Sequence, residues 1–262
     1  MTRTISIVNQ KGGVGKTTTA VNLAASLAVA EKKVLLVDFD PQGNSTSGLG
    51  IEKNCKSIYQ AIVKHETIES LLKQTELKFL TIAPSSRELT GAEIELVDVD
   101  GREYRLKECL KRLTDDFDYI FIDCPPSLSL LTVNALVASD SVLIPLQCEY
   151  YALEGLTELM RTIGLIKERL NPGLEIEGIV LTMFDSRNRL AHQVADEVRA
   201  HFKDKTFKTM IPRNVRLSES PSFGKPALLY DIQSSGAVSY LDLAKELTFL
   251  ERKVSPKNFN KE

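Results

Sequence analysis

The sequence contains little cysteine, no excess of either charge and no long apolar run. The four cysteines, Cys55, Cys109, Cys124 and Cys148, form no Cys-x-x-Cys pair, which favours reduced thiols over a disulfide scaffold. Lys and Arg total 33 against 35 Asp and Glu, a net charge of −2, so any binding of a polyanion must be local. Residues 1–9 lack the regions of a signal peptide, and no apolar run approaches the roughly 20 residues of a membrane span. These absences predict a soluble intracellular protein with a reduced, cytosolic environment.

The composition is that of an ordinary globular protein. Hydrophobic residues make up 43% and charged residues 26%, with 14 Gly and 10 Pro, which excludes a disordered, collagen-like or low-complexity chain. A length of 262 residues fits one large domain, and the sequence has no internal repeat or linker-like segment. We therefore expect a single domain over residues 1–252, followed by a polar C-terminal tail over residues 253–262.

Short apolar runs alternate along the chain with segments that have helical spacing. Most of the runs are apolar throughout, which is typical of parallel strands covered on both faces. The predicted strands are residues 5–8, 34–37, 79–82, 119–122, 142–145 and 176–181. Helices are predicted around residues 20–27 and 153–163 and over 237–250, and residues 55–116 are expected to be mostly helical. The pattern predicts a doubly wound α/β fold with a mostly parallel sheet and helices on both faces.

The most informative stretch follows the first predicted strand and leads directly into a helix. It reads Asn-Gln-Lys-Gly-Gly-Val-Gly-Lys-Thr-Thr-Thr over residues 9–19. A glycine-rich turn before a helix offers converging backbone N–H donors to phosphate groups, and Lys16 adds a positive charge. Thr17 would place its hydroxyl on Mg²⁺, as in the usual Gly-x-x-x-x-Gly-Lys-[Ser/Thr] loop. That pattern is not met strictly, because Gln10 stands where its first glycine belongs and Lys11 precedes Gly12.

The pattern Lys-Gly-Gly-x-Gly-Lys-Thr-Thr resembles the deviant Walker A box of the ParA/MinD superfamily of P-loop ATPases. Five further segments resemble its ParA/Soj branch, the chromosome-partitioning ATPases: residues 37–44, 121–126, 147–155, 181–185 and 211–219. Together they span most of the chain. The resemblance implies a P-loop NTPase fold, ATP and Mg²⁺ as cofactors, and hydrolysis of ATP to ADP and phosphate.

The resemblance also implies where ATP binds. The implied phosphate-binding residues are Lys11, Gly12, Gly13, Val14, Gly15, Lys16, Thr17 and Thr18; Met183, Pro212 and Asn214 would surround adenine, and Glu149 would approach the ribose. In the family two subunits close face to face on two ATP molecules, and the signature lysine, here Lys11, contacts the partner's phosphates. From the residues alone, Lys11 is equally a solvent-exposed lysine, and the residues near the base are equally packing residues of loops.

Three acidic residues follow predicted strands. Asp123 fits the Walker B role of holding Mg²⁺ together with Thr17, and Asp38 is a candidate for the same magnesium shell. Asp40 is the candidate for positioning or activating the attacking water, so that Asp40, Lys11 and Lys16 form the predicted catalytic set. The alternative is that these carboxylates cap the next helix. Residue order does not separate Asp38 from Asp40, whereas the resemblance does.

A basic run extends over residues 199–225, with seven Lys or Arg against two acidic residues and a local charge of +5. Such a run is often only a solvated face, but it also suits binding of a phosphate backbone without reading sequence. The resemblance assigns nonspecific binding of double-stranded DNA to Arg187, Arg189 and Arg216, on faces that become continuous in the ATP-dependent homodimer. It further implies a ParB/Spo0J-like protein that stimulates slow hydrolysis, so that the cycle segregates a chromosome or plasmid. The protein would then be cytoplasmic, and associated with the bacterial nucleoid when ATP is bound.

Three other client classes use the same loop. MinD-like relatives bind membranes through a basic amphipathic C-terminal helix, but residues 253–262 contain a proline and only two apolar residues, so no membrane partner is expected. A metal-cluster carrier needs thiolates at the dimer axis, and no paired cysteine motif supports one. A small-molecule synthetase needs a substrate pocket that the sequence does not identify. The choice between chromosome and plasmid, the cognate centromere and specificity for ATP over GTP stay open.

Overall fold

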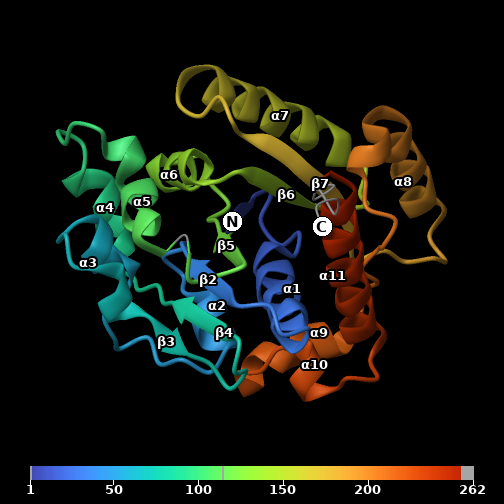
Figure 1. The fold of residues 1–262 in the computed structure, drawn as a ribbon. Helices are drawn as coiled ribbons and strands as arrows, with labels where there is room; N and C mark the ends of the chain where they lie inside the picture. The colour runs from blue at the N-terminus through green and yellow to red at the C-terminus, as the bar shows by residue number, and fades with distance from the viewer. Residues whose placement is uncertain (1, 114, 255–262) are drawn as a thin grey trace, which may run out of the picture.

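A seven-stranded sheet forms the centre of the computed structural model, which describes residues 2–113 and 115–254 (Figure 1). The strand order is β3-β4-β2-β5-β1-β6-β7. Neighbouring strands are parallel except for β3 and β4, which are antiparallel. The strands are β1 (Arg3–Ile7), β2 (Val34–Asp38), β3 (Lys73–Gln74), β4 (Leu80–Ala83), β5 (Tyr119–Asp123), β6 (Ser141–Gln147) and β7 (Glu175–Thr182). Each of the six predicted strands overlaps one of these, and β3 is the strand that the sequence analysis missed.

Helices cover both faces of the sheet, and the reason is visible within a single strand. In β2 the side chains of Leu35 and Val37 join one buried cluster, while those of Val34 and Leu36 join another. Successive residues of a strand point to opposite faces, so a strand that is apolar throughout must be covered twice. The first cluster includes residues of α3–α8 and the second includes residues of α1 and α9–α11. The predicted doubly wound α/β fold is confirmed.

The helices differ greatly in length. They are α1 (Lys16–Val29), α2 (Asn44–Gly48), α3 (Ile58–Ile62), α4 (Leu89–Glu95), α5 (Arg105–Leu110), α6 (Leu130–Ala138), α7 (Ala152–Arg169), α8 (Arg189–Phe202), α9 (Val215–Glu219), α10 (Ala227–Tyr230) and α11 (Ser235–Val254). In its described residues the segment 55–116 contains the short helices α3, α4 and α5, three 3₁₀ turns, β3 and β4. It is therefore less helical than expected.

The last helix, α11, packs against α1 and runs beyond both ends of the predicted helix 237–250 (Figure 1). It includes the first two residues of the predicted tail, and residues 255–262 of that tail lie outside the described part of the chain. Within residues 2–113 and 115–254, no helix combines the length and the apolar character that crossing a membrane requires.

Candidate functional site

The phosphate loop lies between β1 and α1 and is anchored from two other strands. The side-chain amide of Asn9 donates to the carbonyl of Pro145 in β6 at 2.8 Å, and its oxygen accepts from the backbone N–H of Lys11 at 3.0 Å. At the other end of the loop, the hydroxyl of Thr182 in β7 donates to the carbonyl of Val14 at 2.8 Å. The loop is therefore held in shape by the sheet before any ligand binds.

Glycines give the loop its curvature and its open side. Gly13 and Gly15 have φ angles of 74° and 91°, a region that strongly favours glycine. Gly15 precedes α1, whose first turn has no side-chain cap among the described residues, so its N–H groups face out of the helix end. A Cβ atom added to Gly12 or Gly13 would meet no described atom within 4 Å. This arrangement suits an anion at the N-terminus of α1.

The two lysines of the loop have different environments. Lys16 is buried, with 7% of its surface exposed, and its Nζ donates to the carbonyl of Lys11 at 3.2 Å. Burial lowers the pKa of Lys16, and the nearby Asp123 carboxylate only partly opposes this. The Lys11 side chain is half exposed, and its Nζ forms an ion pair with the carboxylate of Glu149. Of the two lysines, Lys16 is therefore the one directed into the loop.

Two carboxylates lie side by side at the carboxyl ends of β2 and β5. Asp38 and Asp123 are register partners in these strands, and both are fully buried. Burial raises the pKa of both groups above the usual range, and the charge of Asp123 adds to the effect on Asp38. The hydroxyl of Ser45 donates to Oδ2 of Asp123 at 2.7 Å, whereas Oδ1 is buried without a hydrogen-bond partner among the described residues.

Asp38 and Asp40 accept hydrogen bonds from the segment that follows β2, and the bonds to Asp38 hold the short helix α2 over the strand ends. Oδ2 of Asp38 accepts from both the backbone N–H and the hydroxyl of Thr46, at 2.7 and 2.6 Å. Oδ1 of Asp40 accepts from the backbone N–H of Gln42 at 2.9 Å, and no hydrogen bond to its Oδ2 occurs within the described residues. Thr46 and Ser45 were not identified from the sequence. Ser45 and Thr46 lie seven and eight residues after Asp38, the last residue of β2, and five and six residues after Asp40. The available signal was that hydroxyl side chains commonly bond to neighbouring polar groups.

The residues at this edge fit a divalent cation bound together with phosphate. The unpartnered buried oxygen of Asp123 needs a positive partner, and the hydroxyl of Thr17 is close enough to lower the pKa of that carboxyl. A carboxylate and a hydroxyl are ligands that Mg²⁺ accepts. Among the described residues, no group of three or more His, Cys, Asp or Glu side chains is placed to hold a metal. A cation at Asp123 would therefore take its other oxygens from phosphate and water.

The residues predicted near adenine come together beside the end of β7. Met183 has a left-handed φ of 48°, and the next residue, Phe184, forms an isolated parallel bridge with Pro212. Asn214 follows two residues later and begins α9, where its side-chain oxygen accepts from the backbone N–H of Arg216 at 2.9 Å. Glu149 is the predicted ribose contact, and in this chain its carboxylate is instead the partner of Lys11.

The three predicted DNA-binding arginines are exposed, and two of them are ion-paired. The Arg187 side chain is 87% exposed and contacts both carboxylate oxygens of Asp185, at 3.0 and 2.9 Å. Arg189 is the exposed first residue of α8. Arg216 in α9 is half exposed and pairs with Glu219 at 2.8 Å.

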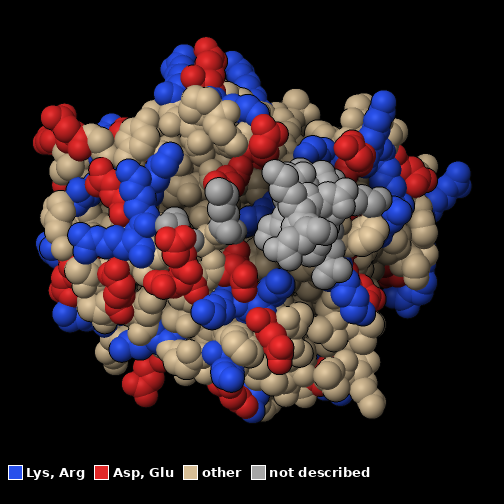
Figure 2. All heavy atoms as spheres, viewed as in Figure 1, with Lys and Arg blue, Asp and Glu red and all other residues tan. Residues whose placement is uncertain are grey.

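The basic run of residues 199–225 is divided between two ends of α11. Its first four basic residues line a pocket of about 540 Å³ that also includes Leu250, near the end of α11. Asn214, beside Arg216, instead bonds to Ser235 at the start of that helix at 2.9 Å. At 1.5 Å per residue, Ser235 and Leu250 are about 22 Å apart along this helix. On the face in Figure 2 basic and acidic side chains are interspersed. The expected concentrated patch is therefore two separate groups.

Cys124 and Cys148 are buried in the core on the α3–α8 face. Burial raises the pKa of both thiols, which keeps them protonated. Their burial agrees with the packing role predicted for them.

Comparison with known proteins agrees with the motifs. Residues 2–176 match the family model described as an AAA domain. The chain is 60% identical over 257 residues to the chromosome partitioning protein ParA of Myxococcus xanthus (strain DK1622), covering 97% of this chain and 91% of that protein. It is 57% identical over 249 residues to the sporulation initiation inhibitor protein Soj of Bacillus subtilis (strain 168), covering 94% and 98%. Its fold also matches the crystal structure of cobyrinic acid a,c-diamide synthase from Mycobacterium smegmatis with bound ATP analogue and magnesium, with a TM-score of 0.84, 34% identity and complete coverage of both chains. The chain therefore belongs to the ParA/Soj family of chromosome-partitioning ATPases, within the ParA/MinD superfamily of P-loop ATPases, as its motifs predicted.

Proposed function

We propose that residues 1–252 form a single Mg²⁺-dependent ATPase domain that partitions DNA. ATP closes two copies into a sandwich dimer, the dimer binds double-stranded DNA without reading sequence, and hydrolysis returns it to monomers that release DNA. A ParB/Spo0J-like protein stimulates the slow hydrolysis, so that the cycle segregates a chromosome or plasmid. The protein is then cytoplasmic, and bound to the nucleoid in its ATP state.

One observation carries the nucleotide part of this proposal. The buried Lys16 charge, the unpartnered oxygen of Asp123 and the open glycine side of the loop converge at the N-terminus of α1. The buried charge and the unpartnered oxygen are costly to the folded chain by itself, and no described protein atom fills the open side of the loop. All three features are complementary to a triphosphate with bound Mg²⁺. The identity of 57–60% to ParA and Soj proteins over nearly the whole chain supports the partitioning role.

The chain's own residues have distinct roles in hydrolysis. Lys16 and the N–H groups of the loop bind and orient the phosphates, and Thr17 and Asp123 would hold the cation. The bound Mg²⁺ supplies neutralisation of charge on the phosphate oxygens. Asp40, whose Oδ2 accepts no hydrogen bond from the described residues, orients the attacking water in line with the γ-phosphate. Asp38 keeps α2 in place through Thr46, which fixes the loop that carries Asp40.

Lys11 contacts nucleotide only when a second subunit is present. In the isolated chain its ammonium pairs with Glu149, and side-chain exposures of 48% and 46% make this pair easy to exchange. In the dimer Lys11 leaves Glu149 and contacts the phosphates bound to the other subunit. Met183, Pro212 and Asn214 surround the adenine. DNA binds to Arg187, Arg189 and Arg216, doubled by dimerisation.

The test is binding to a nonspecific DNA duplex with ATP, ADP or no nucleotide, at several salt concentrations. It uses the Asp40→Ala variant, which should bind ATP without hydrolysing it, and Lys16→Ala as the variant that should not bind nucleotide. Binding with ATP alone, weakening steeply with salt, is the expected result. Binding that is the same with ATP, ADP and no nucleotide, or absent in all three, would overturn the DNA-partitioning role and leave a nucleotide-binding protein with another client.

A further inference from the structure

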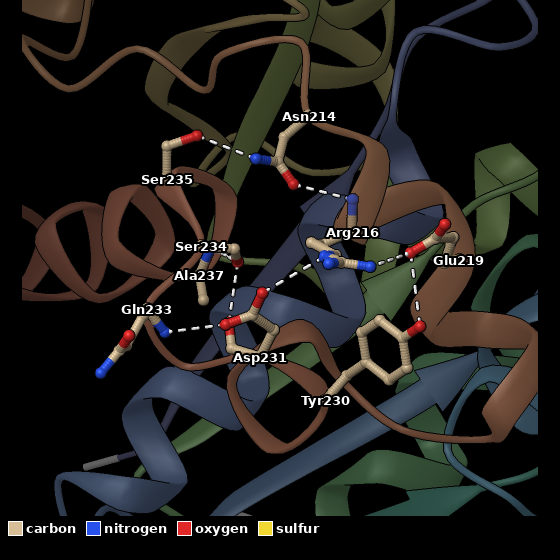
Figure 3. A network of polar contacts seen from close by, with 9 residues as sticks. All are labelled: Asn214, Arg216, Glu219, Tyr230, Asp231, Gln233, Ser234, Ser235 and Ala237. Atoms are coloured by element: carbon tan, nitrogen blue, oxygen red, sulfur yellow. Dashed lines mark hydrogen bonds and ion pairs between the residues drawn. The ribbon is translucent and has the colours of Figure 1, made fainter.

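Arg216 is held between two carboxylates of its own chain (Figure 3). Its Nη1 donates to Oε2 of Glu219 at 2.8 Å, and its Nε lies 3.3 Å from Oδ2 of Asp231. The guanidinium carbon also lies 6.0 Å from the centre of the Tyr230 ring. One positive and two negative groups give this site a local charge of −1, which is opposite to what a DNA contact requires.

Both carboxylates are fixed by contacts other than the arginine. Oε2 of Glu219 also accepts from the hydroxyl of Tyr230 at 3.3 Å, and the Tyr230 ring packs on Phe223 with centroids 4.9 Å apart. Oδ1 of Asp231 accepts from the backbone N–H of Gln233 at 3.2 Å. The acidic groups are therefore part of the local structure and would stay near Arg216 if the arginine side chain moved.

The backbone of Arg216 is fixed as well. The side-chain oxygen of Asn214 accepts from its N–H at 2.9 Å, and the Asn214 amide donates to Ser235 at 2.9 Å (Figure 3). The start of α9 is thereby joined to the start of α11. The Arg216, Glu219 and Asp231 side chains remain 45%, 39% and 35% exposed. A phosphate that reaches the guanidinium from solvent therefore also approaches both carboxylates.

We propose that Glu219 and Asp231 restrain DNA binding at Arg216, by competing with phosphate for the guanidinium and by repelling the DNA backbone. This inference rests on the proposed DNA binding of the ATP-bound dimer. A protein that must release DNA after each hydrolysis cycle benefits from contacts that are individually weak. Glu219 and Asp231 set that weakness without contacting the nucleotide loop in the described structure.

The test is DNA affinity of Glu219→Gln and Asp231→Asn, each in the Asp40→Ala background with ATP, using fluorescence anisotropy of a labelled nonspecific duplex. Removing one negative charge a few ångströms from a phosphate in water should tighten binding about fivefold for each Arg216 site of the dimer that contacts DNA. Glu175→Gln is the matched control, because it also removes one exposed carboxylate from an ion pair, with Lys167 at 2.7 Å. It should leave the affinity within a factor of about two.

A second measurement separates restraint from positioning. The part of the gain from Glu219→Gln that comes from competition for the guanidinium should be lost in an Arg216→Ala background, whereas the part that comes from direct repulsion of the DNA backbone should remain. If the carboxylates instead orient the guanidinium for DNA, both single variants should bind more weakly than the parent. Weaker binding by the single variants, or unchanged affinity, overturns the inference. The proposed function is unaffected by that result as long as the parent, Asp40→Ala, still binds DNA only with ATP. Loss of DNA binding by parent and variants alike overturns both, and circular-dichroism melting establishes that each variant is folded.

Discussion

Replacing Lys16 by alanine should abolish tight nucleotide binding without destabilising the ligand-free protein. The Lys16 ammonium is buried, and burial lowers its pKa, which means that the folded protein holds this charge at a cost. Removing the charge removes that cost. This gain offsets the loss of the buried aliphatic stem, so the melting temperature of Lys16→Ala without ligand should stay close to that of the wild type, and a loss of binding cannot then be attributed to unfolding.

The expected size of the binding loss follows from the contacts available. A hydrogen bond to a charged group contributes about 1.5–3 kcal/mol, so loss of one such contact with a phosphate weakens affinity by roughly 10- to 150-fold. Lys11→Ala is the matched control from the same loop. Its Nζ contacts Glu149, in an exposed pair worth at most about 1 kcal/mol. Nucleotide affinity of a Lys11→Ala monomer should change less than about fivefold, whereas the ATP dimer should be lost.

The assay is titration of each variant with a fluorescent ATP analogue and Mg²⁺, at a protein concentration where the wild type is monomeric. Sedimentation velocity with ATP at higher concentration then measures the dimer. Equal losses of nucleotide affinity in the two variants would refute the different roles assigned to the buried and the exposed lysine. A stable ATP dimer of Lys11→Ala would refute the cross-subunit contact, and a markedly lower melting temperature of Lys16→Ala would refute the argument from burial.

Three further predictions concern hydrolysis, backbone and pH. Asp40→Ala should bind ATP and dimerise but lose steady-state phosphate release, and retained turnover would move the water-positioning role to another residue. Gly224→Ala should lower the free energy of unfolding in urea by about 1–3 kcal/mol, because the φ of Gly224 is 63° and an added Cβ would lie 2.7 Å from the backbone that follows α2. Gly101→Ala is the control: its φ is 68°, but no described atom lies within 4 Å of the added Cβ, so the loss should be smaller. Because burial raises the folded-state pKa of Asp38 and Asp123, the ligand-free protein should lose stability as pH rises from about 4 to about 7, and Asp38→Asn should flatten that fall.

The sequence predicts the sheet well because its central strands are buried on both faces, which leaves an unambiguous apolar signal. The strand β3 has only Lys73 and Gln74, which are polar and lie at the sheet edge, so it carries no such signal. The nucleotide site is equally predictable up to a point. Parallel strands bring their carboxyl ends to one edge, so Asp38 and Asp123 were expected to lie near the loop after β1.

What the sequence does not predict is how the charges are paired. Ser45 and Thr46 bond to the two buried carboxylates, and Glu149 pairs with Lys11 from 138 residues away. The basic run 199–225 is continuous along the chain, yet its first four basic residues lie in a pocket with Glu246 and Leu250 of α11, whereas Asn214 bonds to Ser235 at the start of that helix. Counting charges along a sequence treats neighbours in the chain as neighbours in space, and this fails where the chain crosses from one end of a helix to the other.

Under the proposed function, ion pairing at the arginines also bears on how ATP would control DNA binding. Arg187 and Arg216 are both paired with carboxylates of their own chain, so each half-site in a monomer should bind a DNA backbone weakly. Joining two weak half-sites in one dimer raises the overall affinity by about 10²–10⁴ through effective concentration alone. Nonspecific complexes at physiological salt have dissociation constants of about 10⁻⁴–10⁻⁶ M, so a weakened half-site falls below useful affinity while the doubled site stays above it. On this proposal ATP needs no change of shape at the arginines: dimerisation is sufficient, and the carboxylates keep the half-site of a monomer too weak to hold DNA by itself.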